Sequence, residues 1–155
     1  MIIWGIAIET PNYAANDLTG EGAKRTGGRW NRKGLPVVYC SKSIALAVLE
    51  TLVHLNQWDL PLSRFLVEVT IPDSLWAARQ RLDHFSAPGG WDALPAGMAS
   101  IVAGSNWLIS ASSAVLEVPS VIVPEESNVL LNPFHSDFHR IQARILRRWN
   151  YDHRF

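Results

Sequence analysis

The residue best suited to catalysis is Glu50, a carboxylate inside a largely apolar segment that runs from Ile44 to Leu55. Its neighbours at i−4, i−3 and i+3 on a helix are apolar: Leu46, Ala47 and Val53. A carboxylate in such surroundings raises the free energy of the fold unless it is paired or used in chemistry. A boundary glutamate that reaches water, or one that contacts His54 four residues on, has the same pattern.

A glycine-rich stretch around Arg29 offers a second candidate. It runs Gly27-Gly28-Arg29-Trp30-Asn31, with Gly22 before it and Gly34 after it. Glycines let the backbone approach a ligand closely, and an arginine among them can donate to two phosphate oxygens at once. An ordinary surface turn with a solvated arginine has the same composition. The spacing matches neither a Walker loop nor the GxGxxG motif.

Tyr39 and Ser120 are two further candidates. Tyr39 lies near the end of a short apolar run, where a phenol can stack on a ligand ring or cap the core. Ser120 follows Pro119 inside another apolar run, so its hydroxyl can point into a cleft. Each also fits a structural role, as a packed aromatic ring or as a kink that breaks a strand.

Hydrophobic periodicity predicts a mixed α+β fold to position these residues. Strands are expected at 1–8, 36–40, 65–71, 114–123 and 128–131, and helices at 44–55, 72–82 and 98–108. Pro119 interrupts its strand and favours an edge or a bulge there. Prolines and glycines between 84 and 97 indicate a long loop. The spacing from 141 to 149 suits a strand or a helix, and no regular βαβ rhythm is present.

Composition limits the class of protein. The 155 residues suit one domain spanning 1–155, and 48% hydrophobic with 18% charged residues argues against disorder. Fourteen basic and fourteen acidic residues leave no net charge, which disfavours direct binding to nucleic acid. The single Cys40 excludes an intramolecular disulfide and a cysteine-based zinc cluster.

Other absences in the sequence set further expectations. No His-Glu-x-x-His motif occurs, so no metal is expected. No apolar run reaches the roughly 18 residues that span a bilayer, so no membrane contact is expected. A lone cysteine suits a reducing compartment, and a cytoplasmic protein is predicted.

Taken together, the motifs resemble the RES domain family over nearly the whole chain. They are Gly20-x-Gly22-Ala23, Gly27 to Asn31, Pro36 to Tyr39, Ser43-x-Ala45-Leu46-Ala47-x-x-Glu50, Val53-His54, Trp107, Leu116-x-Val118-Pro119-Ser120, Asn128, Leu131-Asn132-Pro133-x-His135 and Asp152-x-Arg154-Phe155. The family is named for Arg, Glu and Ser, which correspond here to Arg29, Glu50 and Ser120. Ser110, Ser112 and Ser113 are nearby alternatives for the serine. The resemblance implies an ADP-ribosyltransferase-like fold with small mixed β-sheets, helices, an NAD⁺ cleft and a C-terminal strand.

The resemblance also implies an activity. It predicts the toxin of a type II toxin–antitoxin pair that cleaves the nicotinamide–ribose bond of NAD⁺, which is a substrate rather than a cofactor. Water, phosphate and a protein side chain all stay open as the acceptor. The expected catalytic residues are Glu50, Arg29, Tyr39 and Ser120, and the expected nucleotide contacts are Arg29, Trp30, Tyr39 and Asn132.

The implied partner is an Xre-type helix-turn-helix antitoxin, which forms a hetero-oligomer with the chain. The chain would contact DNA only indirectly, through this antitoxin. One position departs from the family: Gly5 follows Trp4, where members commonly carry an arginine. An attenuated or non-catalytic domain that binds its antitoxin is therefore an alternative, unless Lys24, Arg25 or Arg32 replaces that charge. A ribonuclease would need a basic groove, which the neutral charge balance does not favour.

Overall fold

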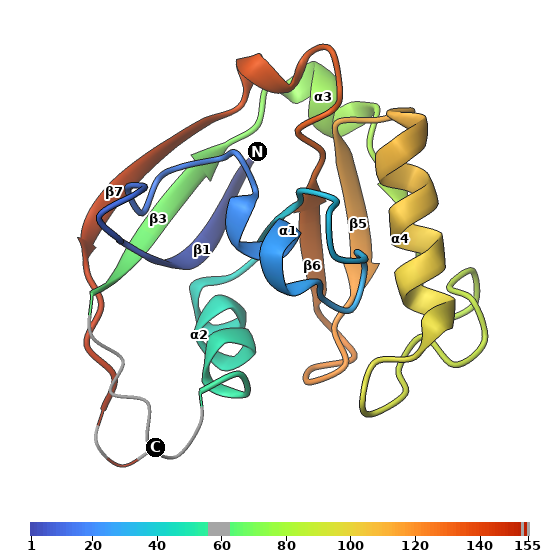
Figure 1. The fold of residues 1–155 in the computed structure, drawn as a ribbon, viewed down its shortest axis with the longest axis horizontal. Coiled ribbons are helices and arrows are strands. Elements are labelled where there is room, and N and C mark those ends of the chain that lie inside the picture. The colour runs from blue at the N-terminus through green and yellow to red at the C-terminus, as the bar shows by residue number, and fades with distance from the viewer. Residues whose placement is uncertain (56–62, 153, 155) are drawn as a thin grey trace.

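The computed structural model describes residues 1–55, 63–152 and 154, whose strands form one seven-stranded sheet in the order β4-β5-β6-β2-β1-β3-β7 (Figure 1). The strands are β1 (Ile2–Ile8), β2 (Val38–Ser41), β3 (Arg64–Thr70), β4 (Gln80–Arg81), β5 (Val115–Pro119), β6 (Ser127–Leu131) and β7 (Gln142–Arg148). The helices are α1 (Glu21–Thr26), α2 (Ile44–Leu52), α3 (Asp73–Ala77) and α4 (Met98–Ser110), with a 3₁₀ turn η1 (Phe138–Arg140). The predicted mixed α+β class is confirmed.

The sheet consists of two halves that meet at one residue pair. β1 pairs with β3 along all seven of its residues, but with β2 only through Trp4 and Ser41. Beyond that pair the β1-β3-β7 half and the β2-β6-β5-β4 half diverge, as Figure 1 shows. The divergence leaves an opening between the halves that segments 13–23 and 37–39 help to line.

Two clusters of buried side chains stabilise the two halves of the sheet. One contains Ile3, Val67 and Val69 of the first half together with Val115 and Val129 of the second. The other lies under α4 and gathers three tryptophans with strand residues: Trp30, Trp91, Trp107, Leu116, Val118 and Leu130. Large rings buried in this way explain part of the high tryptophan content.

Helix α4 approaches the glycine-rich segment so closely that Gly104 has no room for a side chain. A Cβ at Gly104 would lie 2.0 Å from the Trp30 carbonyl oxygen. Because that neighbour is backbone, Gly104→Ala is expected to destabilise the fold by about 3 kcal/mol or more. The urea dependence of unfolding measures this. Gly89→Ala is the matched control, since nothing lies within 4 Å of that added Cβ, and equal midpoints for both variants would contradict the packing.

Several predicted element boundaries need correction. The 44–55 helix ends at Leu52, and the 72–82 helix ends at Ala77 because Gln80 and Arg81 form β4 beside β5. The 114–123 strand ends at Pro119, and β5 is neither an edge nor bulged, since it lies between β4 and β6. The short β4 faces only Leu116 and Glu117, so the proline interrupts no ladder on that side.

Other boundaries match the prediction. The loop at 84–97 contains no helix or strand, the helix at 98–108 extends to Ser110, and the ambiguous tail is strand β7. β7 pairs with β3 from Gln142 to Arg148, with a register shift between Leu66 and Val67.

β5 carries a buried carboxylate that periodicity did not reveal. Glu117 is 1% exposed and pairs with Lys42, Arg79 and Arg81 at 2.7–3.2 Å. Burial raises the pKa of Glu117, but hydrogen bonds from Arg79 and Lys42 and the nearby positive charges outweigh it and hold the pKa below its usual value. Glu117 and the three cations therefore form a structural ion-pair network. It links β5 to the residue after β2 and to the segment that contains β4.

Candidate active site

Residues from two other segments hold the carboxylate of Glu50. Its Oε1 accepts a hydrogen bond from the Ser120 hydroxyl at 2.8 Å and another from Asn128 Nδ2 at 2.5 Å. Glu50 comes from α2, Ser120 from the turn after β5, and Asn128 from β6. Glu50 Oε2 makes no hydrogen bond to any residue that the structure describes, so one oxygen is available to a ligand.

The two donors are themselves fixed. The Ser120 oxygen accepts from the N–H groups of Ile122 and Val123, both at 3.1 Å, so its single proton goes to Glu50. The Ser41 hydroxyl donates to Asn128 Oδ1 at 2.7 Å, which turns the amide nitrogen toward Glu50. A carboxylate held by oriented donors is the kind of group that stabilises positive charge without rearranging.

The N-cap of helix α2 determines where Glu50 lies on that helix. The Ser43 hydroxyl accepts from the Leu46 N–H at 3.1 Å and donates to Glu126 at 2.8 Å. This N-cap starts the helix directly after β2, and Leu46 and Ala47 then pack inward. Glu50 follows about one helical turn after these residues, within hydrogen-bond distance of Asn128 in β6.

Arg29 lies at the tip of a tight hairpin. Gly28 and Asn31 exchange both backbone hydrogen bonds, which leaves Arg29 and Trp30 as the two central residues. Arg29 Nη1 donates to the carbonyls of Trp91 and Ala93 at 2.8 and 2.9 Å. Its Nε and Nη2 donate to no residue in the described part of the chain, so the guanidinium fastens the 84–97 loop and still has donors for an oxyanion.

Tyr39 is clamped at its hydroxyl and open at its ring. The hydroxyl donates to Asn31 Oδ1 at 2.7 Å and accepts from the Trp30 N–H at 3.0 Å, while 37% of the residue stays exposed. A Cβ at Gly28 would lie 2.8 Å from this hydroxyl, so the close approach requires glycine. Burial of the hydroxyl raises the pKa of Tyr39, so the phenol stays neutral and its ring offers a stacking surface.

β2 brings the two parts of the site together. Tyr39 and Ser41 lie on the same face of this strand, two residues and therefore about 6.6 Å apart. Ser41 reaches Glu50 through Asn128, and Tyr39 lies close enough to Arg29 for the positive charge to act on the phenol. The structure thus gathers Glu50, Ser120, Tyr39 and Arg29 around one end of β2.

The remaining predicted contacts are interior. Trp30 is 3% exposed and stacks on Trp91 with ring centroids 6.3 Å apart. Asn132 is fully buried, donates to the Leu108 carbonyl and accepts from the Phe134 N–H. Both hold backbone segments in place, and a direct contact of either with a nucleotide stays a prediction.

The alternative serines lie elsewhere. Ser113 is buried between Trp107 Nε1 and the Val115 carbonyl, and Ser110 and Ser112 bond to each other at 3.0 Å. Of the candidate serines, Ser120 is the one that contacts Glu50.

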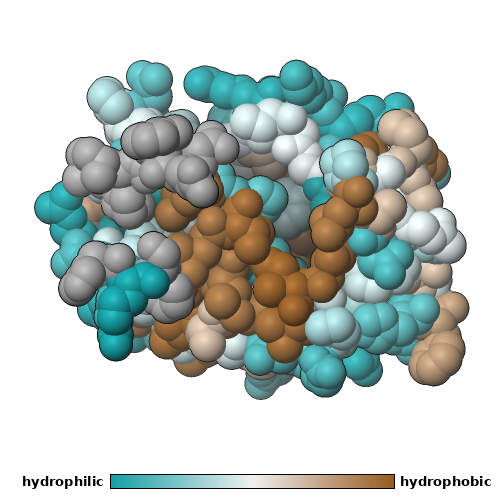
Figure 2. Space-filling model, turned by 90° about the horizontal axis from the view of Figure 1, so that it is seen from below, coloured by the Kyte–Doolittle hydropathy of each residue, from teal (hydrophilic) through white to brown (hydrophobic). Residues whose placement is uncertain are grey.

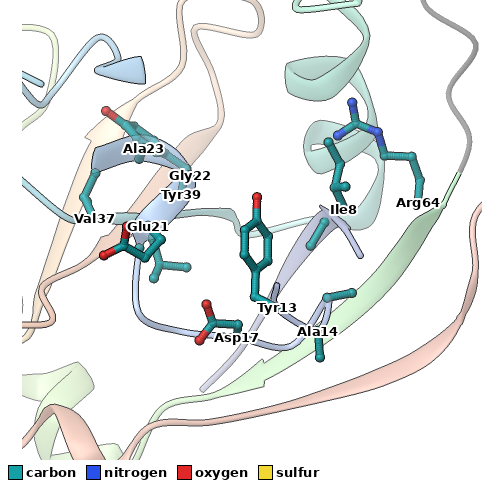
Figure 3. Close-up of a pocket in the computed structure, with 14 residues that line it drawn as sticks. Ile8, Tyr13, Ala14, Asp17, Glu21, Gly22, Ala23, Val37, Tyr39 and Arg64 are labelled. Atoms are coloured by element: carbon teal, nitrogen blue, oxygen red, sulfur yellow. The ribbon is translucent and has the colours of Figure 1, made fainter. Parts of the chain in front are cut away.

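A cavity of about 260 Å³ lies between the diverging halves of the sheet (Figure 3). Its wall includes Ala7 and Ile8 of β1, Val38 and Tyr39 of β2, and Arg64 at the start of β3. Its volume is somewhat below the roughly 300–1,000 Å³ of typical ligand sites, which suits one half of a dinucleotide. Tyr39 belongs both to this cavity and to the group around Glu50.

An apolar surface borders this end of the molecule. Seen from below, apolar side chains cover a large area beside a recess (Figure 2). In Figure 1 this end carries the C-terminal half of α2, the β5–β6 connection and the loop before α4. Exposed apolar side chains on these segments include Val53 (60%), Leu94 (79%) and Met98 (67%). Patches of this kind typically meet another protein.

Other chemistries have little support among the described residues. No group of three or more His, Cys, Asp or Glu side chains there converges as a metal site. Burial raises the pKa of Cys40 to about 12, so its thiol is a poor nucleophile. No helix within the described ranges has the length and apolarity to cross a membrane.

In the sequence, Asn31 and Asn128 belong to the family motifs and Ser41 is a possible N-cap, but none of the three was assigned to the site. Asn128 and Ser41 are opposite each other in the β2–β6 register, and Asn31 joins Tyr39 to the glycine-rich segment. For Ser41 and Asn128 the available signal was a polar residue in a short apolar strand, and for Asn31 it was an asparagine in the glycine-rich segment. Strand pairing, which the sequence does not show, supplies the rest.

The chain is similar to known proteins over nearly its whole length. A family model described as "RES domain" matches residues 2–153. The chain is 53% identical over 151 residues to the "Prs ADP-ribosylating toxin" of Sphingobium sp. (strain YBL2), covering 97% of this chain and 94% of that protein. It is 45% identical over 127 residues to "Toxin Res" of Yersinia enterocolitica, covering 81% of each.

A solved structure shares the fold. The crystal structure of the M. tuberculosis MbcT–MbcA toxin–antitoxin complex contains a chain that superposes with a TM-score of 0.58 at 16% identity. The superposition covers 94% of this chain and 84% of that one.

Proposed function

The chain belongs to the RES domain family, and from that membership we propose that it is the toxin of a toxin–antitoxin pair that cleaves the nicotinamide–ribose bond of NAD⁺. The observation that carries the proposal is the Glu50 carboxylate, which Ser120 and Asn128 hold at one oxygen and leave free at the other. Relatives named as toxins support the same biological class.

The site's chemistry suits this cleavage. Nicotinamide leaves as a neutral molecule when its bond to ribose C1′ breaks, so the reaction needs little acid catalysis. The remaining ribose develops oxocarbenium character, and the negative charge of Glu50 would stabilise it and accept from a ribose hydroxyl. Tyr39 would stack on the nicotinamide ring, and Arg29 would bind the pyrophosphate.

The acceptor decides the products. Water would give ADP-ribose and a proton, phosphate would give ADP-ribose 1″-phosphate, and a protein side chain would become ADP-ribosylated. The name of the Sphingobium relative favours protein modification as the second candidate. Incubation of the purified protein with NAD⁺ labelled in the adenosine half, in water, in phosphate and with cell extract, separates the three products. Failure to form any of them would reject the proposal.

The partner proposed for this toxin is an antitoxin of the Xre type, bound in a hetero-oligomer. The structural neighbour comes from a toxin–antitoxin complex, and the apolar surface at the end of the molecule that carries the C-terminal half of α2 offers a protein a place to bind (Figure 2). Contact with DNA would then run through the antitoxin alone.

Gly5 provides a test of the substrate. Nothing lies within 4 Å of a Cβ built there, and Gly5 lies on the same face of β1 as Ala7, which lines the cavity. An arginine at this position could therefore reach the cavity and its phosphate. Gly5→Arg is expected to lower the KM for NAD⁺ about tenfold or more, since a charge-assisted contact is worth roughly 1.5–3 kcal/mol.

Gly5→Gln is the matched control, because it has length without charge and should leave the KM near its original value. Nicotinamide release measured over a range of NAD⁺ concentrations compares the three proteins. Equal KM values for all of them would show that position 5 does not face the substrate.

A further inference from the structure

The cavity between the two halves of the sheet is lined by charged residues that have no part in the site around Glu50. Arg64 is the sole basic residue among those that line it, and Asp17 and Glu21 are the acidic ones. Figure 3 shows Arg64 beside Ile8 at one side of the cavity, with Asp17 and Glu21 away from it. The charged side chains are therefore segregated.

The acidic residues already have partners. Asp17 accepts from the Thr19 hydroxyl at 2.6 Å and from its N–H at 3.2 Å. Glu21 pairs with Lys24 at 3.3 Å and Arg25 at 3.7 Å. Two cations therefore balance the charge of Glu21, and the hydroxyl and N–H of Thr19 hydrogen-bond the carboxylate of Asp17.

Arg64 has no comparable partner. Its Nε is shielded from solvent and forms no hydrogen bond, and the structure shows no ion pair for its guanidinium among the described residues. A shielded, unsatisfied donor on a charged group raises the free energy of the fold, and such groups occur where a ligand completes the bonding. A ligand that completes the bonding of Arg64 would bring an acceptor, and an anion satisfies both the donor and the charge.

Backbone hydrogen bonds fix the position of Arg64 beside the cavity. Arg64 is opposite Ile8 in the β1–β3 register, and its carbonyl accepts from the Trp149 N–H at 2.8 Å. The preceding Ser63 carbonyl accepts from the Glu9 N–H at 3.1 Å. Strands on both sides therefore fix the starting point of the side chain.

We propose that Arg64 binds a phosphate group in this cavity, as a second anion-binding arginine in addition to Arg29. The planar guanidinium matches the oxygens of a phosphate, and the cavity volume of about 260 Å³ suits one half of a dinucleotide. The inference rests on the proposed function. Two sources share this chemistry: the pyrophosphate of NAD⁺, and free phosphate that acts as the acceptor.

The test compares Arg64→Gln, which removes the charge, with Arg64→Lys, which keeps the charge without the planar fork. Arg140→Gln is the matched control, because Arg140 is an exposed arginine that donates to Ser74 and does not line the cavity. Thermal unfolding of each variant checks that the fold survives. Nicotinamide release is then measured in phosphate-free buffer and in a phosphate series.

If Arg64 binds the substrate, Arg64→Gln raises the KM for NAD⁺ about tenfold or more with kcat within about twofold, Arg64→Lys lies between, and Arg140→Gln matches the original protein. If it binds the acceptor, the KM for NAD⁺ stays constant and stimulation by phosphate is lost. Both outcomes support a phosphate site and identify its source. Unchanged KM and unchanged phosphate dependence would overturn it.

A binding arm separates this inference from the proposed function. Calorimetric titration of NAD⁺ and of inorganic phosphate into Glu50→Gln, with and without Arg64→Gln, needs no turnover. If binding to Glu50→Gln depends on Arg64 while the original protein cleaves no NAD⁺, the phosphate site is upheld and the proposed function is rejected. Cleavage of NAD⁺ with no effect of Arg64 in either assay would do the reverse.

Discussion

Replacement of Glu50 by glutamine is expected to slow nicotinamide release from NAD⁺ by about 10²–10³-fold, the usual effect of removing one electrostatic contact to a transition state. Glutamine keeps the shape of the side chain and can still accept from Ser120 and Asn128, so the fold should be preserved. The negative charge beside the developing oxocarbenium ion would be gone. The effect should therefore appear in kcat much more than in KM.

Glu125→Gln is the matched control for this change. Glu125 is exposed and lies in the β5–β6 connection at the same end of the molecule. It should cleave NAD⁺ at the original rate. Full activity in Glu50→Gln would remove Glu50 from the mechanism and leave it as a structural partner of Ser120.

The second large effect is expected for Arg29→Lys, with a loss of about 10- to 100-fold in kcat/KM for NAD⁺. Arg29 uses Nη1 on the carbonyls of Trp91 and Ala93 and keeps its other nitrogens for a phosphate. A lysine has one ammonium group at the end of its chain and cannot span both sets of acceptors. It would either release the 84–97 loop or lose the phosphate.

Steady-state kinetics and NAD⁺ titration of Arg29→Lys measure this loss. Arg25→Lys is the control, because Arg25 is exposed on α1 and pairs with Glu21. If Arg29→Lys binds NAD⁺ as tightly as the original protein, the guanidinium only hydrogen-bonds the 84–97 loop and does not bind the substrate.

The sequence predicted the local parts of the site well. The apolar spacing from Ile44 places Glu50 on a helix, and Ser43 is an N-cap residue by type. The glycines around Arg29 predict a turn or a close approach to a ligand; a tight hairpin is present, in which a Cβ at Gly28 would meet the Tyr39 hydroxyl, and the approach to a ligand stays a prediction. These features depend on short-range geometry, which residue order specifies directly.

What depends on pairing between distant segments was missed. Asn128 reaches Glu50 because β6 pairs with β2, and β4 forms because Gln80 and Arg81 meet β5. The 114–123 run turns at Ser120, whose oxygen binds two following N–H groups instead of continuing the strand. A local hydrogen bond of this kind competes with the ladder, and hydrophobicity alone does not show it.

The unpartnered charge at Arg64 was also invisible in the sequence. Its significance comes from the divergence of β1 from β2 after Trp4, which opens the cavity that Arg64 lines. Arginines at strand ends are common, and the spacing alone gives no reason to prefer this one. The contacts of the folded chain provide that reason.

The central claim is that this chain cleaves the nicotinamide–ribose bond of NAD⁺ with Glu50. Its most direct test is the amount of free nicotinamide that purified protein releases from NAD⁺ over time, with Glu50→Gln prepared in parallel. We expect many nicotinamides per protein molecule with water, phosphate or an added protein acceptor, and about 10²–10³-fold slower release by the variant. Release at equal rates by both proteins, or by neither under any of the three acceptor conditions, would contradict it.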